Sequence, residues 1–392
     1  MKSDPITTSE SIELSIVLPC LNEELTVGNC VKQAISFLAG SGVKGEVVVV
    51  DNGSTDRSVE IAEENGARVA HISQKGYGSA LAGGFKAARG KYIIMADADE
   101  SYDLVNLMPF VEKLRQGYDL VMGNRFKGGI KKGAMPWHHK YIGNPVLSFV
   151  GQLFFRTPAK DFHCGIRGFS KGAIEQMSLQ TSGMEFASEI VVKASILGMK
   201  VAEVPTTLSP DKRDRPPHLR SFRDGWRHLR FLLIYSPRWL FLYPGIVLLF
   251  LGGIASLALF FGTVNIGFRP LDFHSFIIAG TVMTVGLSMV SFALITRVYA
   301  YNFGLLPSRP RFFSLFKFFN LEIGLISGVV LIAFGIILIV RAAILSYTPG
   351  FDSIGFGSSI RLVFGSSLAI IVGSQVILTS FVLSMLGLNP KE

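Results

Sequence analysis

The stretch Tyr92-Ile-Ile-Met-Ala-Asp-Ala-Asp-Glu100 is the most informative part of this sequence, because an apolar run ends there in two carboxylates separated by one small residue. A short apolar run bounded in this way is consistent with a buried strand. Asp97 and Asp99 could then present two oxygen ligands to one Mg²⁺ or Mn²⁺ ion, which would keep coordination positions free for phosphates. Two neighbouring acids are also common in solvated turns, so this pattern alone does not decide between a metal site and a turn.

Short apolar runs alternate with amphipathic segments over the first half of the chain. The runs lie at residues 14–19, 46–51, 68–72, 92–96 and 120–123, and the amphipathic segments lie near 24–39, 56–64, 79–89 and 105–116. This alternation of strand and helix patterns predicts an α/β fold.

Polar clusters follow three of these predicted strands. Asn22 and Glu23 follow the first, the run Asp51-Asn-Gly-Ser-Thr-Asp56 follows the second, and Asp97 to Asp99 follow the fourth. Ligands bind beyond the carboxyl ends of strands in α/β sheets, so the three clusters are expected to meet in one crevice. Asp51 is expected to accept hydrogen bonds from a base or ribose, whereas Asp56 is expected to cap the following helix.

The glycine patterns exclude two common nucleotide sites. The run Gly76-Tyr-Gly78-Ser-Ala-Leu81 fails the dinucleotide fingerprint at its last position, and the sequence contains no P-loop motif. A nucleotide would therefore be held by the strand-end carboxylates and a metal rather than by a glycine-rich loop.

The second half of the chain has the composition of a membrane-spanning domain. The 392 residues have a mean hydropathy of +0.42, and four stretches carry no charged residue. These stretches are 240–267, 273–296, 323–340 and 362–388. About 20 helical residues cross a hydrocarbon core, so four transmembrane helices are predicted.

Charges in the connections predict the orientation of these spans. The second connection contains Arg297, Arg309, Arg311 and Lys317 without an acid, and basic short loops stay in the cytoplasm. Residues 1–239 and the C-terminus are then expected to lie in the cytoplasm. If the chain is prokaryotic, the four spans are expected to lie in the plasma (inner) membrane. Residues 1–11 lack a signal-peptide pattern and are expected to be a loose tail. The three cysteines are expected to be ordinary thiols.

Residues 211–239 are strongly basic and precede the first span. Phe222, Trp226, Leu229 and Leu233 recur at helical intervals beside Arg223, Arg227 and Arg230. Such a helix is typical of one that lies on anionic lipid, and the adjacent span favours lipid over nucleic acid. A purely anchoring role and a direct acceptor-binding role both remain open. Prolines 210, 216 and 217 should place Lys212, Arg213 and Arg215 on a loop that reaches back toward the metal site.

Together, these motifs resemble glycosyltransferase family 2. The resemblance covers residues 14–239 and is closest to the branch of dolichyl-phosphate mannosyltransferases and bacterial polyprenyl-phosphate glycosyltransferases. It rests on Leu18-Pro-Cys-Leu-Asn-Glu23, Val50-Asp-Asn-Gly-Ser-Thr-Asp56, the D-x-D, Gly123-Asn-Arg125 and Asp161-Phe-His-Cys-Gly-Ile-Arg167. It implies a Rossmann-like GT-A fold, an inverting reaction, a nucleotide-diphosphate sugar donor and a metal on the D-x-D.

The resemblance also implies roles for matching residues. Pro19, Asn22, Glu23 and Asp51 would surround the base and ribose of the donor. Asp97 would lie at the sugar-diphosphate region and Asp99 on the metal. Arg125 would contact the acceptor phosphate. Independently of the resemblance, at least one of Arg213 and Arg215 is expected to bind the acceptor or the diphosphate, because bringing two anions together requires fixed positive charge between them. Asp161 and Glu189 could orient Arg167 or sugar hydroxyls, or form structural ion pairs.

Three departures from the family pattern limit this transfer of roles. The usual Ser-Gly-Phe-Arg appears here as Cys164-Gly-Ile-Arg167. Ser101 stands where many relatives have a metal-binding Gln, which leaves Glu100 or water as a substitute. An arginine expected beyond Gly143 is missing, and His138, His139 or Lys140 could replace it.

The sequence therefore predicts residues 1–11 as a tail, 12–210 as the catalytic domain, 211–239 as the basic interfacial segment, 240–388 as four spans and 389–392 as a cytoplasmic end.

The predicted activity is transfer of one hexose, such as glucose or mannose, to undecaprenyl or dolichyl phosphate. A processive polysaccharide synthase, suggested by Arg238-Trp239, and a non-catalytic membrane scaffold are the alternatives.

Overall fold

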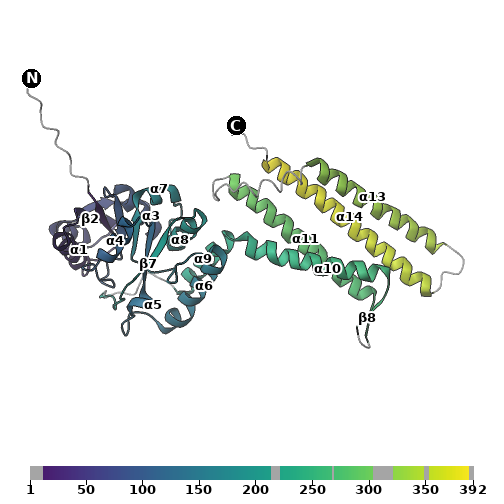
Figure 1. Ribbon diagram of the computed structural model, residues 1–392, viewed down its shortest axis with the longest axis horizontal. Helices are drawn as coiled ribbons and strands as arrows, with labels where there is room; N and C mark the ends of the chain where they lie inside the picture. Colours follow the sequence, from purple (N-terminus) through teal and green to yellow (C-terminus); the bar gives the residue numbers. More distant parts are fainter. Residues whose placement is uncertain (1–11, 213–220, 267–268, 303–320, 348–352, 388–392) are drawn as a thin grey trace, which may run out of the picture. The chain divides into compact units, whose positions relative to one another are not determined.

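The computed structural model describes residues 12–212, 221–266, 269–302, 321–347 and 353–387 (Figure 1). Residues 1–11, 389–392, Arg213 and Arg215 lie outside this described part of the chain, so the expectations for them remain predictions. The chain divides into two units, Met1–Tyr235 and Ser236–Glu392, and each is described by itself.

The first unit contains a seven-stranded sheet with the strand order β3-β2-β1-β4-β6-β5-β7. Its strands are β1 (Leu14–Cys20), β2 (Gly45–Asp51), β3 (Arg68–His71), β4 (Tyr92–Met95), β5 (Leu120–Asn124), β6 (Arg167–Ser170) and β7 (Val201–Pro205). Strand β6 is antiparallel to β4 and β5, and the other neighbouring pairs are parallel. The five predicted strands are confirmed, and β6 and β7 are additional.

Helices cover both faces of this sheet, so the unit has three layers (Figure 1). Alternate side chains of a strand point to opposite faces, and accordingly Ile16 and Leu18 lie in one core while Val17 lies in the other. The first core is closed by α1 (Val27–Ser41), α2 (Ser58–Glu64) and α4 (Met108–Arg115). The second core is closed mainly by α3 (Tyr77–Ala87), α7 (Lys171–Met177) and α8 (Phe186–Ile196). This is the GT-A, Rossmann-like architecture that the resemblance implied.

Shorter elements connect β5 to β6. They are α5 (Arg125–Gly128), the π-helix η1 (His139–Gly143) and α6 (Asn144–Phe155). Gly151 of α6 packs against the ring of Phe162, which lies in the second core. The segment after α6 therefore returns to the sheet through a buried aromatic contact.

Helix α9 (Ser221–Ile234) is the last helix of the first unit. It packs on the rest of that unit through Phe231 and Leu232, which lie in the second core. Phe222 and Trp226 instead remain 93% and 59% exposed. Part of the predicted apolar stripe thus faces away from the protein, as an interfacial helix requires. The structure adds a buried polar side to this helix, formed by Asp224 and His228.

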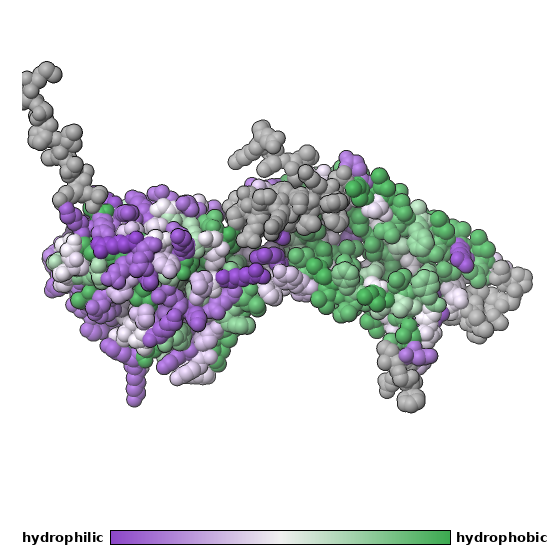
Figure 2. Space-filling view, viewed as in Figure 1, coloured by the Kyte–Doolittle hydropathy of each residue, from purple (hydrophilic) through white to green (hydrophobic). Residues whose placement is uncertain are grey.

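The second unit confirms the prediction of membrane spans. In the described part of the chain, four helices are long and apolar enough to cross a membrane, at Arg238–Phe261, Phe273–Asn302, Leu321–Ser346 and Gly357–Leu386. They correspond to η2 (Arg238–Leu242) with α10 (Tyr243–Phe261), α11 (Phe273–Asn302), α13 (Leu321–Ser346) and α14 (Ser353–Gly387). Figure 2 shows a largely hydrophobic surface on the visible face of these helices.

The uncharged stretch 240–267 is longer than the helix that it contains. Helix α10 ends at Phe261, and the remainder enters a short hairpin of β8 (Val264–Ile266) and β9 (Arg269–Leu271). Helix α10 packs on α11, α13 packs on α14, and α11 and α14 join the two pairs.

Close packing of α10 on α11 gives a first testable prediction. A Cβ atom on Gly252 would overlap the backbone nitrogen of Met283, so only glycine allows this approach. We expect Gly252→Ala to push the helices apart and to cost about 1–3 kcal/mol of stability, measured as a lower midpoint of thermal unfolding in detergent. Gly253→Ala is the matched control, because its Cβ would meet only the Met283 side chain at 3.8 Å. Equal midpoints for the two variants would contradict this packing.

Candidate active site

The loops after β1 and β2 are joined by hydrogen bonds at the edge of the sheet. Strand β1 lies between β2 and β4 and runs parallel to both, so the three carboxyl ends lie side by side. Asn22 donates its backbone N–H to Ser54 Oγ at 3.0 Å, and its side-chain oxygen accepts from the Thr55 N–H at 2.7 Å. Asn22 has a φ of 56°, a left-handed conformation that Asn tolerates better than most residues. The predicted meeting of the first two polar clusters is thus confirmed.

Two buried carboxylates lie in these loops. Asp51 accepts hydrogen bonds from the Ser54 N–H at 2.8 Å, and its other oxygen lies 3.2 Å from His71 Nδ1. Burial raises the pKa of Asp51, but the hydrogen bonds from Ser54 and His71 outweigh burial and lower it overall. Glu23 is also buried, and Pro19 is half-buried in β1 opposite Val50. Asp51 is therefore an anionic acceptor suited to ribose hydroxyls.

Asp56 behaves as expected for a residue at a helix start. Its carboxylate accepts from the N–H of Ser58, the first residue of α2, at 3.0 Å. It also accepts from the Glu24 N–H at 3.2 Å, which adds a further link between the two loops.

The D-x-D follows β4 and is held by its neighbours. Tyr77 donates its hydroxyl to Asp97 Oδ1 at 3.2 Å, and a side chain at Gly165 would overlap Asp97 Oδ2. Asp99 is buried and accepts from the Ser101 N–H at 3.0 Å. The carboxylates therefore belong to an ordered, partly buried site rather than to a solvated turn.

This donor set suits a hard divalent cation that also binds phosphates. Among the residues that the structure describes, no group of three or more His, Cys, Asp or Glu side chains forms a metal cage. Mg²⁺ in phosphate-handling sites is commonly bound by only one or two carboxylates together with water and substrate phosphates. Two carboxylates at one strand end fit that pattern.

Glu100, one of the two predicted substitutes for the missing Gln, forms an ion pair with Lys212. It has a left-handed φ of 61°, and its carboxylate accepts from Lys212 Nζ at 2.6 Å. Lys212 also donates its backbone N–H to the Asp99 carbonyl at 3.3 Å. At Lys212 the chain thus returns to the D-x-D, as predicted for the basic loop.

Arg125 forms a buried ion pair with Asp161. Its Nε and Nη2 atoms each donate to the Asp161 carboxylate at 2.7 Å, and its backbone N–H donates at 2.9 Å. Asp161 is fully buried, and Arg125 is nearly so. This two-point contact fixes the plane of the guanidinium group at the start of α5.

Arg167 is held by carbonyl groups. Its guanidinium group donates to the carbonyls of Cys164, Ala187 and Phe162, at distances of 2.6 to 3.2 Å. Complete burial lowers its pKa from the usual value. Asp161 and Glu189 form structural ion pairs, which was one of the two alternatives predicted for them, and neither is hydrogen-bonded to Arg167 in the described part of the chain. Asp161 holds Arg125, and Glu189 pairs with Lys193 at 2.8 Å and accepts from Thr181.

Lys140 lies on η1, where its ammonium group is 5.4 Å from the Tyr141 ring centre. The surface of η1 and α6 around it is apolar and basic. Residues 126–160 contain no Asp or Glu. Large apolar side chains exposed there are Trp137, Tyr141, Ile142, Val146 and Phe149. The sequence signal for this surface is the long acid-free stretch, which did not enter the sequence-based predictions.

Tyr77 and Tyr102 were also missed. The Tyr102 hydroxyl accepts from the Gly165 N–H at 2.8 Å and so connects the segment after β4 to residues 161–167, hereafter the catalytic motif. Neither tyrosine belongs to a recognisable motif. Their partners lie 20 and 63 positions away in the sequence, so only the folded chain identifies them.

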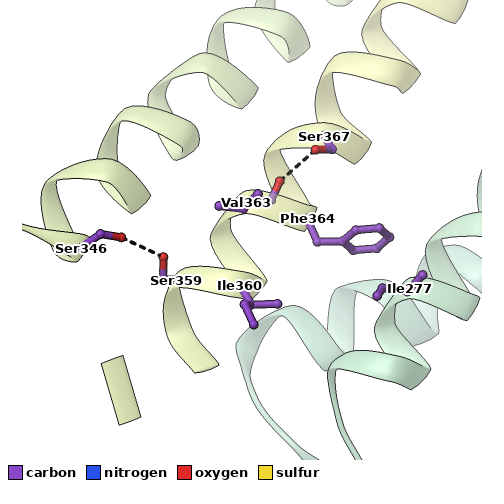
Figure 3. A pocket seen from close by; sticks show the side chains of 7 residues that line it. All are labelled: Ile277, Ser346, Ser359, Ile360, Val363, Phe364 and Ser367. Carbon is purple, nitrogen blue, oxygen red and sulfur yellow. Dashed lines mark hydrogen bonds between the residues drawn. The ribbon is translucent and has the colours of Figure 1, made fainter. Parts of the chain in front are cut away.

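A cavity of 380 Å³ lies within the second unit (Figure 3). Its lining includes the hydroxyl groups of Ser346, Ser359 and Ser367 and the Phe364 ring. It contains none of the predicted site residues.

Two family profiles and several known proteins match the sequence of this chain. The profile of Glycosyl transferase family 2 matches residues 15–178, and that of the Glycosyltransferase family 2 C-terminal transmembrane region matches residues 294–387. The low-salt glycan biosynthesis hexosyltransferase Agl6 of Haloferax volcanii is 39% identical over 286 residues, covering 73% of this chain and 68% of that protein. The dolichyl-phosphate hexose transferase of the same organism is 29% identical over 195 residues, covering 49% and 81%.

Among solved structures, this chain is partly similar to glucosyl-3-phosphoglycerate synthase from Mycobacterium tuberculosis, solved with Mn²⁺, UDP and glucosyl-3-phosphoglycerate. The match has a TM-score of 0.45 and 23% identity, and covers 57% of this chain and 80% of that chain.

Proposed function

Because this multi-pass membrane protein belongs to glycosyltransferase family 2, we propose that it transfers one hexose from a nucleotide-diphosphate sugar to a polyprenyl phosphate at the cytoplasmic membrane face. The observation that carries the proposal is that the carboxyl ends of β2, β1 and β4 lie at one edge of the sheet, with the buried carboxylate of Asp51 at the end of β2 and the D-x-D after β4. The names of the two Haloferax relatives support a hexose as the transferred sugar and, in one of them, a dolichyl-phosphate acceptor.

The donor would bind along the edge of the sheet. Asp51 would accept hydrogen bonds from the base or ribose, with Pro19, Asn22 and Glu23 around them. Asp97 would lie at the sugar-diphosphate region. A Mg²⁺ or Mn²⁺ ion held by Asp99, with Asp97 beside it, would neutralise the diphosphate and help it to leave. The Lys212 ammonium adds a positive charge from the protein at the same place.

The acceptor would need no general base. A lipid phosphate is already anionic at neutral pH, so it can attack the anomeric carbon directly and invert it. The tasks left to the protein are alignment and charge neutralisation. Arg125 would contact the acceptor phosphate through Nη1, since Asp161 occupies its Nε and Nη2. Lys140, Arg213 and Arg215 are the further candidates for phosphate binding.

A direct assay tests this function. The purified full chain would be incubated with a panel of labelled nucleotide sugars, Mg²⁺ or Mn²⁺, and polyprenyl phosphate in lipid. We expect one donor to yield a lipid carrying a single sugar. A long polymer would identify a processive synthase instead, and no product from any donor would favour a membrane scaffold.

Topology gives a further prediction. With four spans and a cytoplasmic basic loop, a cysteine at position 308 should resist an impermeant thiol reagent in intact cells, and one at position 353 should react. The native cysteines are buried, so they should add little background. The control is labelling after permeabilisation, which should reach both positions. Reversed accessibility would overturn the cytoplasmic placement of the catalytic unit.

A further inference from the structure

Three polar side chains, of which Ser188 and His228 are buried and His163 is half-buried, connect the catalytic motif to α9. His163 belongs to the catalytic motif, Ser188 to α8 and His228 to α9. The Ser188 hydroxyl lies 3.2 Å from His163 Nε2 and 2.9 Å from His228 Nδ1. The two imidazole rings meet nearly edge to face, with their centres 4.5 Å apart. The proposed function assigns no role to any of the three.

Hydrogen bonding through Ser188 couples the tautomers of the two imidazole rings. Burial lowers the pKa of His163 well below its usual range and that of His228 to about 4, so both rings are neutral near pH 7. A neutral imidazole has one donor and one acceptor nitrogen, and a serine hydroxyl has one proton. If Ser188 donates to one ring, it can only accept from the other. The tautomer of His163 is therefore linked to that of His228.

The placement of His163 makes this link relevant to the active site. It lies two residues from Asp161, which holds Arg125, and two residues from Gly165, which packs against Asp97. His163 Nδ1 is buried and has no hydrogen-bond partner in the described part of the chain. The polar contact that holds the ring therefore comes from Ser188.

We propose that Ser188 and His228 are positioning residues, which hold His163 and with it the catalytic motif against Asp97 and the Arg125–Asp161 pair. On this proposal α9 is a structural support of the active site as well as a surface for lipid. The inference rests on the proposed function for its effect on catalysis, but the link itself is a property of the fold.

Variants of His228 separate positioning from simple packing. His228→Leu keeps an apolar side chain of similar bulk and loses the hydrogen bond, whereas His228→Asn offers an amide near the place of Nδ1. Small misplacements of catalytic groups can cost about 100-fold in rate, so we expect His228→Leu and Ser188→Ala to lower kcat by about that factor. The KM for the donor should stay within about twofold, and His228→Asn should recover most of kcat.

Gly225→Ala is the matched control on the same helix, because a Cβ there meets nothing within 4 Å. It should leave kcat unchanged. Wild-type kcat in His228→Leu would overturn the proposal. So would a loss of kcat that parallels a loss of folded protein in thermal unfolding, since that is the result of packing alone.

Nitrogen NMR of the full chain in nanodiscs, labelled at its seven histidines, tests the link without any sugar transfer. We expect Ser188→Ala and His228→Leu each to shift the ring nitrogens of His163. Unchanged His163 signals would overturn the link, whatever reaction the protein catalyses. An inactive wild-type chain with the expected shifts would instead contradict the proposed function and leave the link standing.

Discussion

Asp99→Asn is expected to abolish sugar transfer while leaving the catalytic unit folded. The amide keeps an oxygen that can accept the hydrogen bond from the Ser101 N–H, but it loses the charge that would hold a divalent ion. A bound metal supplies several kcal/mol of charge stabilisation, so the expected loss of kcat is about 1,000-fold or more. The measurement is transfer from the identified donor by the full chain in lipid.

The control for this variant is Asp103→Asn, which removes an exposed carboxylate on the same loop. It should keep wild-type activity. Excess chelator should reproduce the Asp99→Asn result in the wild-type chain. Full turnover by Asp99→Asn in excess chelator would remove the metal-dependent mechanism.

Arg125→Ala is expected to lose both activity and stability, for two different reasons. It would remove the proposed contact to the acceptor phosphate, and it would leave the Asp161 carboxylate buried without its partner. Breaking a buried pair from one side costs about 3–5 kcal/mol of unfolding free energy. Activity and thermal unfolding should therefore both be measured.

A double variant separates these two effects. Arg125→Met with Asp161→Asn removes both charges of the pair, and the Asn side-chain oxygen can still accept the hydrogen bond from the backbone N–H of residue 125. Removing both charges of a buried ion pair costs far less than removing one. We expect the double variant to unfold near the wild-type temperature and to remain inactive. Recovery of activity together with stability would show that Arg125 has only a structural role.

The basic face of α9 provides a contrast to Arg125. Arg223, Arg227 and Arg230 should act through lipid attraction, worth about 1 kcal/mol each near an anionic surface. Arg223 and Arg227 also lie 3.6 and 3.7 Å from the buried Asp224 carboxylate. Because four spans already anchor the chain, replacing all three with Ala should reduce transfer only mildly. If this triple variant lost activity while the Arg125 double variant and an Arg213/Arg215 double Ala variant kept it, the acceptor phosphate would have to lie on α9.

Strands β1 to β5 were predictable because local sequence specifies them. Strands β1, β2 and β4 are continuous apolar runs that end in polar residues, and that pattern needs no knowledge of the rest of the chain. Strand β6 carries no such signal. Its sequence is Arg-Gly-Phe-Ser, and it becomes a strand by pairing antiparallel between β4 and β5. Strand β7 was missed as well, since Val201–Pro205 includes a charged residue and a proline.

The residues of the candidate site likewise fall into a predictable group and a group that could not be predicted. The strand-end residues Asn22, Asp51, Asp97 and Asp99 could be predicted, because the ends of neighbouring strands must lie together. Side-chain partners between distant segments could not be predicted, since residue order does not specify them. The choice of Arg125 rather than Arg167 as the partner of Asp161 is one example, and the contact of Tyr77 with Asp97 is another.

The division of the chain at Tyr235 has a consequence for biosynthesis. Every predicted site residue, together with Ser188 and His228, precedes the first span in the sequence. Ribosomes add about 5–20 residues per second and domains generally fold as units from the N-terminus, so the seven-stranded sheet is synthesised before the first hydrophobic span begins. The nascent chain can thus assemble its active-site framework while the membrane helices are still being translated.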